Sequence, residues 1–314
     1  MSKLKNFLLN NWPVKPLIDL SKKLRLPGFD GIPLYYVTDF FSQRMNEGDI
    51  QTRARSMAFS FFLALFPAII FIFTLIPYIP IQDFQDQLLS LIQSFLPSST
   101  YDAAQTTIED IVKHQRGGLL SFGFLFALYI SADGILALMK WFNTSYHGEQ
   151  KRSGWRMRLM SIGLTITLAF FVIMSIALIL SSEMVYHYLS KHHILTNHMH
   201  VFILQSIKWI ILLVLCFSAI SMLYYFGPSK VDQLRFISAG SSLATLLIVV
   251  TSLAFNFFIT HFAQYNKIYG SIGTLIIILI WLYINSLVLL IGYELNISIQ
   301  KAKKHKIISL PIEQ

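Results

Sequence analysis

The chain has 314 residues, of which 54% are hydrophobic and only 13% carry a charge. This composition excludes an ordinary soluble globular protein, because a soluble chain of this length needs more polar surface. Several apolar runs approach the ~20 residues that a helix needs to cross a ~30 Å hydrocarbon core. The runs are continuous rather than alternating, which favours helices over a barrel. We therefore predict an all-α integral membrane protein.

The formal net charge of +9 is high enough to raise the question of a nucleic-acid partner. We assign the charge instead to lysines and arginines on the cytoplasmic face of a membrane, and we expect no nucleic acid to bind. Cys216 is the single cysteine, so an intramolecular disulfide cannot form. The Phe7–Leu9 patch is too short for the apolar region of a cleavable signal peptide.

Residues 1–52 are expected to form a polar, basic segment in the cytoplasm or at the membrane interface. Within it, Ile32–Arg44 places Leu34, Val37 and Phe40 at helical spacing. An amphipathic helix of this kind suits the membrane interface. A short cytoplasmic helix that packs against the spans explains the same pattern, and both alternatives stay open.

Six spans are expected within a transmembrane domain of residues 53–297. Their approximate ranges are 56–78, 119–142, 158–180, 201–226, 236–262 and 271–294. Residues 80–117, between the first two spans, carry apolar residues at helical spacing on both sides of Pro97, which predicts an external helical hairpin. Residues 298–314 are expected to form a basic cytoplasmic tail.

The lysines and arginines indicate how the spans are oriented. One side of the membrane receives 20 of these residues and the other side receives 4, while Lys208 lies inside the fourth span. Positive residues gather on the cytoplasmic side of membrane proteins. We therefore predict that the N-terminus and the C-terminus are both cytoplasmic.

Two stretches predict hinges or gates. Pro67 lies near the middle of the first span, where it removes one helix hydrogen bond and should kink the helix. The connection before the last span carries two tyrosines and two glycines that permit close approach of the backbone: Tyr265, Tyr269, Gly270 and Gly273. This connection is expected to act either as an outward gate or as an aromatic belt that ties the last two spans together.

Four stretches resemble the YihY/BrkB family of bacterial inner-membrane proteins, which formerly carried a ribonuclease BN label. They are Arg55–Pro67, Ser131–Asn143, Leu223–Pro228 and Tyr265–Leu295. The resemblance covers roughly residues 35–297. It implies a multi-pass protein of the bacterial cytoplasmic (inner) membrane and supplies no established activity. One departure is Ala239-Gly240, where family members often carry proline and glycine.

Asp133 is the acidic residue that lies deepest in a predicted span. A lone carboxylate there costs about 2.5–3.5 kcal/mol on insertion scales, so it should be paired, protonated or hydrated. Tyr129 lies one helical turn away on the same face, and Arg53 and Arg55 are the expected cationic partners. The carboxylate is expected either to fix helix packing as a buried ion pair or to line a substrate or proton pathway.

Two further polar residues of the last span are candidates for such a pathway. Asn285 shares one helical stripe with Trp281, and an amide in a span usually forms a hydrogen bond with a neighbouring helix. Glu294 lies at the predicted inner boundary, where we expect it to pair with Arg55 or Lys301.

The first functional hypothesis is a transporter or flippase-like protein for a lipid-like or amphipathic anionic substrate. The second is an envelope-assembly scaffold that docks partners through the hairpin of residues 80–117. Membrane lipids with anionic headgroups are the expected partners, and a homo-oligomer is compatible with the sequence. The chain shows no pattern for a phosphate-binding loop or a catalytic nucleophile, so we expect no enzyme, cofactor or metal site and disfavour a ribonuclease. The histidines near residues 187–200 fit no zinc motif.

Overall fold

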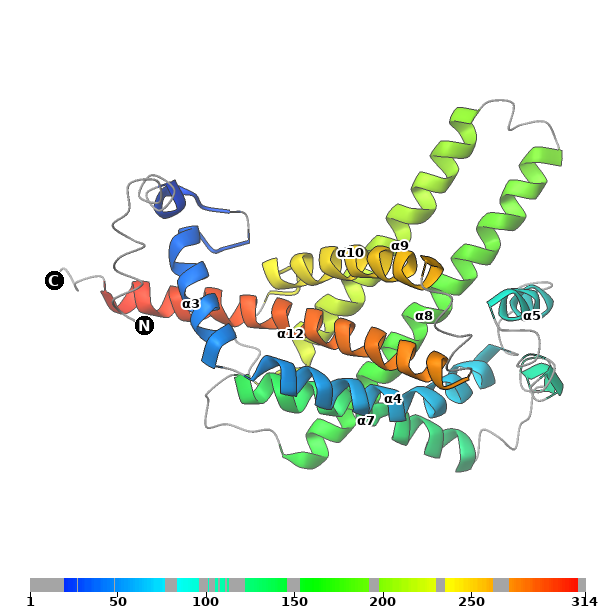
Figure 1. Ribbon diagram of the computed structural model, residues 1–314, viewed down its shortest axis with the longest axis horizontal. Helices are drawn as coiled ribbons and strands as arrows, with labels where there is room; N and C mark the ends of the chain where they lie inside the picture. Colours follow the sequence, from blue (N-terminus) through cyan, green and yellow to red (C-terminus); the bar gives the residue numbers. More distant parts are fainter. Residues whose placement is uncertain are drawn as a thin grey trace. The chain divides into compact units, whose positions relative to one another are not determined.

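A computed structural model describes residues 20–26, 28–47, 49–76, 84–95, 101, 105–106, 108–110, 112, 122–145, 153–191, 198–229, 235–261 and 271–309. These residues form helices and their connections, and no strand occurs among them. The helices are α3 (Leu34–Glu47), α4 (Ile50–Leu75), α5 (Phe84–Phe95), α7 (Phe122–Ser145), α8 (Gly154–Lys191), α9 (His198–Phe226), α10 (Ala239–His261) and α12 (Ser271–Ser309) (Figure 1). The all-α prediction is confirmed for this part of the chain.

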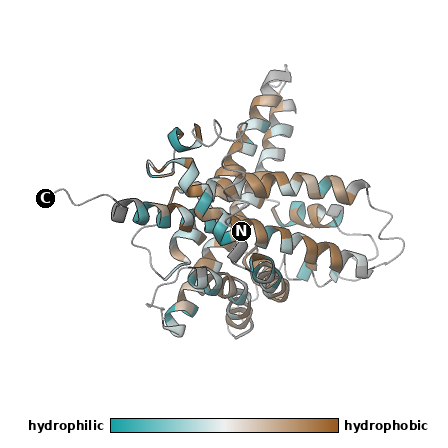
Figure 2. Ribbon diagram, turned by 60° about the vertical axis from the view of Figure 1, so that its left-hand side comes forward, coloured by the Kyte–Doolittle hydropathy of each residue, from teal (hydrophilic) through white to brown (hydrophobic). Residues whose placement is uncertain are grey.

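Six of the described helices are long and apolar enough to cross a membrane: α4, α7, α8, α9, α10 and α12. Apolar residues predominate along these helices in Figure 2. The predicted number of spans is therefore confirmed. The cytoplasmic position of the termini stays a prediction.

The last helix is longer than the span that the sequence predicts. α12 has 39 residues. At ~1.5 Å per residue it is about 58 Å long, nearly twice the ~30 Å thickness of a hydrocarbon core. The segment that we expected to begin a separate tail at residue 298 continues this helix to Ser309.

The chain divides into two compact units. The first comprises residues 1–58, 139–151 and 220–314, and the second comprises residues 59–138 and 152–219. The division falls inside α4, α7 and α9, so each of these helices contributes residues to both units.

In the first unit, α3 lies across the C-terminal part of α12 (Figure 1). Val37 on α3 is buried against Ile299 and Ala302 on α12, together with Phe29 and Ile32 from the loop before α3. The apolar face of α3 is therefore used for packing within the protein. This contact corresponds to the second alternative for Ile32–Arg44, a helix that packs on the spans.

In the second unit, α5 forms the first half of the predicted hairpin. Phe84, Leu88 and Leu89 of α5 are buried in one cluster with Ile76 and Leu180. The apolar face of α5 therefore packs against the unit itself. Most of the second half of the hairpin lies outside the described residues, and the side of the membrane that it occupies stays a prediction.

A second cluster in this unit joins α4, α7 and α8 through Phe71, Ala127, Leu128 and Ala169. Gly134 on α7 lies so close to α4 that an added Cβ would be 2.7 Å from the Phe61 ring. Helix α7 is therefore held tightly against α4 next to Asp133.

Candidate functional site

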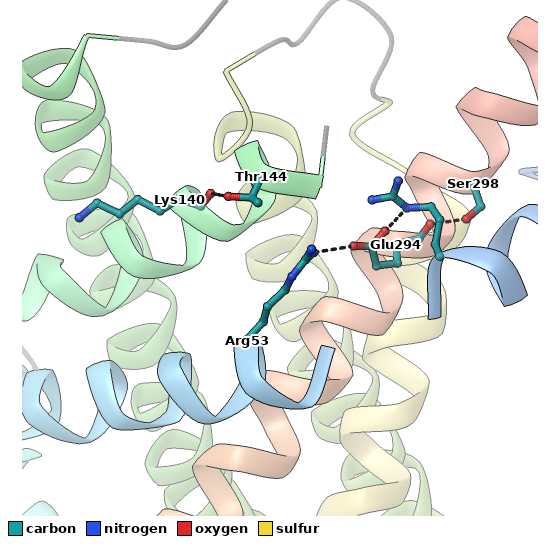
Figure 3. A network of polar contacts seen from close by, with 6 residues as sticks. Arg53, Lys140, Thr144, Glu294 and Ser298 are labelled. Carbon is teal, nitrogen blue, oxygen red and sulfur yellow. Dashed lines mark hydrogen bonds and ion pairs between the residues drawn. The ribbon is translucent and has the colours of Figure 1, made fainter. Parts of the chain in front are cut away.

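Within the described residues, a group of charged side chains lies inside or beside an apolar helix in each unit. In the first unit the centre of the group is Glu294 on α12, whose side chain is only 5% exposed. Arg44 on α3 donates from Nε to Glu294 Oε2, and Arg53 on α4 donates from Nη1 to Oε1 at 3.4 Å. Figure 3 shows Arg53 and Glu294 pointing toward one another, while Lys140 points away. One carboxylate thus links three helices.

The two arginines are themselves largely enclosed, with side chains that are 9% exposed for Arg44 and 18% exposed for Arg53. The Arg53 guanidinium also lies 5.8 Å from the centroid of the Trp141 ring, which is cation–π distance. Charges in such surroundings are costly unless they are paired. The loss of any one of these three side chains is therefore expected to destabilise the other two.

The pairing expected for Glu294 occurs with partners other than Arg55. Residues two apart on a helix point about 200° away from one another, since each residue turns the helix by about 100°. Arg53 faces α12, and Arg55 is therefore exposed. Arg44 was missed as a partner, although it lies four and seven residues after Phe40 and Val37, on the buried stripe of α3.

The residues around Glu294 contact other helices of the first unit. Gly292 lies against Gly240 of α10, where a Cβ added to Gly240 would be 2.1 Å from the Gly292 carbonyl oxygen. Tyr293 stacks on Phe142 of α7 with ring centroids 3.9 Å apart. Tyr224 of α9 donates its hydroxyl to the Leu289 carbonyl oxygen at 2.6 Å. These contacts bring α7, α9 and α10 to one short stretch of α12.

Asn296 completes this stretch by capping the first turn of α10. Its Oδ1 accepts a hydrogen bond from the Gly240 backbone N–H at 2.8 Å, and its Nδ2 donates to Ser238 Oγ at 3.0 Å. Ser238 and Ser241 also bond to one another's backbone N–H groups in a reciprocal cap. The small residues at the start of α10 therefore lie in close contact with α12.

Asn285 does not reach a neighbouring helix as its amide was expected to do. Its Nδ2 donates to the Trp281 carbonyl oxygen at 2.8 Å, one turn earlier on α12. This hydrogen bond lies within α12 and is not the bond to a neighbouring helix that the sequence predicted.

The charged group of the second unit is an ion pair between α7 and α8. Arg158 Nη1 donates to Asp133 Oδ1 at 2.6 Å and to the Tyr129 carbonyl oxygen at 3.4 Å. The guanidinium lies 3.8 Å from the centroid of the Tyr129 ring. Asp133 lies close to the middle of the apolar stretch Phe124–Thr144 of α7.

The two charges of this pair differ in exposure. The Asp133 side chain is 49% exposed, whereas the Arg158 side chain is 14% exposed. The Tyr129 side chain is also exposed. The carboxylate therefore lies on the outside of the described structure, with the guanidinium beneath it.

Arg158 takes the place that the sequence gave to Arg53 and Arg55 as the partner of Asp133, and that expectation was wrong. Arg158 lies in the second turn of α8, and its guanidinium reaches both Asp133 and the Tyr129 carbonyl oxygen on α7. Arg158 lies on the same face of α8 as Ser161 and Thr165, which are both buried. Their spacing of three and four residues was the sequence signal that could have indicated an inward-facing Arg158.

The hinge and gate candidates fall into two groups. Pro67 lies inside α4, which is helical from Ile50 to Leu75, and Gly273 is buried in the first turn of α12. Tyr265, Tyr269 and Gly270 lie outside the described residues, so the gate stays a prediction. Among the residues that the structure describes, no three His, Cys, Asp or Glu side chains lie close enough together to hold a metal ion.

The family described as virulence factor BrkB matches residues 41–310. The chain belongs to the virulence factor BrkB family. The resemblance drawn from the four sequence stretches is thereby confirmed. The ribonuclease-like protein YfkH of Bacillus subtilis (strain 168) is 30% identical over 270 residues, which cover 86% of this chain and 96% of YfkH.

More distant relatives in the BrkB family are named only as membrane proteins. The UPF0761 membrane protein IL2447 of Idiomarina loihiensis is 24% identical, over 83% of this chain and 90% of that protein. A UPF0761 membrane protein of Vibrio campbellii is 24% identical, over 82% of this chain and 80% of that protein. No solved structure matches the chain.

The match to the BrkB family begins at residue 41, inside α3. Phe29, Ile32 and Val37 lie before that point, yet all three are buried in the core of the first unit. Residues 28–40 are therefore part of the folded unit in this chain.

Proposed function

We propose that this member of the BrkB family transports an amphipathic anionic molecule with a lipid-like tail, and that Arg158 and Asp133 contact its headgroup. The observation that carries the proposal is an ion pair within apolar helices whose carboxylate is half exposed. A pair that served only to hold helices together is expected in the interior, because charge that faces hydrocarbon is costly. A polar headgroup that passes this surface offsets that cost.

The geometry of Arg158 suits a phosphate or carboxylate ligand. Both of its hydrogen bonds use Nη1. A guanidinium carries five N–H donors in one plane, so further donors remain for the oxygens of an anion. Stacking on Tyr129 fixes the orientation of that plane. Exposed apolar side chains of the same two helices, including Phe126 and Leu159, lie on the surface along which a tail can extend.

Asp133 then acts as an internal anion that competes with the substrate. When the site is empty, its carboxylate neutralises Arg158. When a headgroup binds, the carboxylate is displaced and takes up water. This exchange limits how tightly the anion is held, which transport requires because a substrate must also leave.

The test compares Asp133→Asn with Arg158→Lys in purified protein reconstituted into vesicles, with movement of fluorescent anionic phospholipid between leaflets as the assay. Asp133→Asn should lower transport more than it lowers folded yield. Arg158→Lys keeps the positive charge but loses the planar guanidinium with its paired N–H donors. The loss of one charge-assisted hydrogen bond costs about 1.5–3 kcal/mol, so substrate binding should become at least about tenfold weaker. A zwitterionic phospholipid analogue is the substrate control.

A scaffold without transport is the competing hypothesis. It rested on an exposed apolar hairpin, but α5 buries its apolar face against its own unit. Equal loss of transport and folded yield in Asp133→Asn, or no lipid movement by the unaltered protein, would favour the scaffold.

The name of YfkH raises a third possibility, cleavage of RNA. We do not extend that activity to this chain, because the described residues offer a pair of opposite charges on a lipid-facing helix and not a cluster of catalytic groups. Protein purified free of soluble nucleases should leave RNA intact.

A further inference from the structure

The region around Asp30 in the first unit carries charge and apolar surface that the transport proposal does not use. Asp30 accepts a contact from Arg235 Nη1 at 3.0 Å and one from Lys303 Nζ at 3.0 Å. It thereby ties the loop before α3 to the segment before α10 and to the end of α12. Both cations remain substantially exposed, so their outer N–H groups face away from Asp30.

The backbone of this loop is shaped to bring its segments together. Gly28, Asp30 and Gly31 have φ angles of 86°, 52° and 72°, in the left-handed region. A Cβ added to Gly28 would lie 3.4 Å from Ala239 Cβ, so the loop contacts the first residue of α10. The Leu34 N–H donates to the Leu24 carbonyl oxygen at 2.9 Å, which holds residues 20–24 beside the start of α3.

Large apolar side chains are exposed on the two segments that Asp30 and Gly28 join. They are Leu20, Leu24, Leu26, Phe236 and Ile237, and Ile237 is 71% exposed. Exposed cations alternate with them: Lys22, Lys23 and Arg25 in the first segment and Arg235 in the second. Apolar side chains beside cations are the composition of a surface that lies in the headgroup region of an anionic membrane.

The place of Phe236 and Ile237 in the chain, just before the span of α10, indicates that this surface meets the membrane. Phe236 and Ile237 lie three and two residues before Ala239, where the apolar span of α10 begins. The exposed surface is therefore continuous with a helix that enters the bilayer. The apolar face of α3, for which the sequence left open both the membrane interface and packing against the spans, is buried on α12.

We propose that residues 20–26 and Arg235–Ile237 form one binding surface for anionic phospholipid at the N-terminus of α10. The apolar side chains insert among the upper acyl chains, and the cations bind phosphate oxygens. Asp30 is a positioning residue that sets Arg235 and Lys303 at the edge of this surface. This inference goes beyond the transport proposal and does not depend on it.

The first experiment measures insertion. The single cysteine allows a Cys216→Ser background, into which Leu26→Cys, Ile237→Cys and Ser42→Cys are introduced one at a time and labelled with an environment-sensitive fluorophore. Ser42 is exposed on α3 and serves as the control position. In full-length protein in nanodiscs, nitroxide-labelled lipids should quench the labels at residues 26 and 237 severalfold more than the label at residue 42. Equal quenching at all three positions overturns the proposal.

The second experiment measures the preference for anionic lipid. Short-chain phosphatidylglycerol is titrated into detergent-solubilised protein labelled at residue 26, with phosphatidylcholine as the comparison. Each cation near an anionic surface strengthens binding about fivefold, so Lys23→Gln with Arg25→Gln should weaken the phosphatidylglycerol affinity by more than tenfold. Arg156→Gln, an exposed charge at the start of α8 in the other unit, should leave the affinity unchanged. Equal affinities for the two lipids, or no effect of the double substitution, overturn the anionic-lipid assignment.

Discussion

Replacement of Glu294 by alanine is expected to destabilise the first unit more than any other removal of a single carboxylate. The substitution leaves Arg44 and Arg53 without the carboxylate that contacts both of them. Removal of one partner from a buried pair costs up to about 3–5 kcal/mol, because it takes away the charge that offset the cost of burying the other. Arg44 is the less exposed of the two arginines, so Arg44→Gln should cost more than Arg53→Gln.

The assay is equilibrium unfolding of purified protein in mixed micelles, combined with a double-substitution cycle between Glu294 and Arg44. Asp30→Asn is the matched control. Asp30 also joins two cations, but Arg235 and Lys303 are well exposed, and such pairs contribute about 0.2–1 kcal/mol. Asparagine also tolerates the left-handed backbone at this position. If Glu294→Ala costs no more than Asp30→Asn, the reasoning from burial is refuted.

Two smaller predictions concern other contacts of the first unit. Gly240→Ala forces a Cβ against the Gly292 carbonyl oxygen and should lower the free energy of unfolding by about 1–3 kcal/mol or more, with a matching loss of folded yield. Gly154→Ala is the control and should be neutral, because a Cβ there meets open space. Asp49 lies before α4, where hydrogen bonds from the Thr52 side chain and from the Thr52 backbone N–H, the latter at 3.3 Å, lower the pKa of the Asp49 carboxyl from the ordinary 3.8. Its contribution to stability should thus be complete above pH 3.8 and lost as the pH falls through the lowered pKa, and Asp49→Asn should remove that part of the pH dependence; an unchanged profile would contradict the cap.

The number and type of the long helices could be predicted from the sequence because they depend on local composition. An apolar run of about 20 residues specifies a span whatever its neighbours are. Partner choice could not be predicted in the same way, since it depends on the rotation of each helix about its axis. Arg53 and Arg55 are equivalent in a count of charges, yet only Arg53 points toward Glu294. The helical spacing of apolar residues in α3 indicates which face is buried, but its partner on α12 lies more than 250 positions away and is not specified by that spacing.

The stretch Gly292–Asn296 shows why polar residues of one span need separate interpretation. Its side chains and backbone contact α3, α4, α7, α9 and α10 within little more than one helical turn. A substitution there disturbs contacts with five neighbouring helices. Loss of transport after such a substitution is therefore first explained by impaired folding, and it is not evidence that the residue lines a substrate pathway. Asp133 differs because its carboxylate has Arg158 on one side and open surface on the other. A selective loss of transport on substitution of Asp133, with the unfolding free energy preserved, therefore carries information about the substrate that the Glu294 group cannot supply.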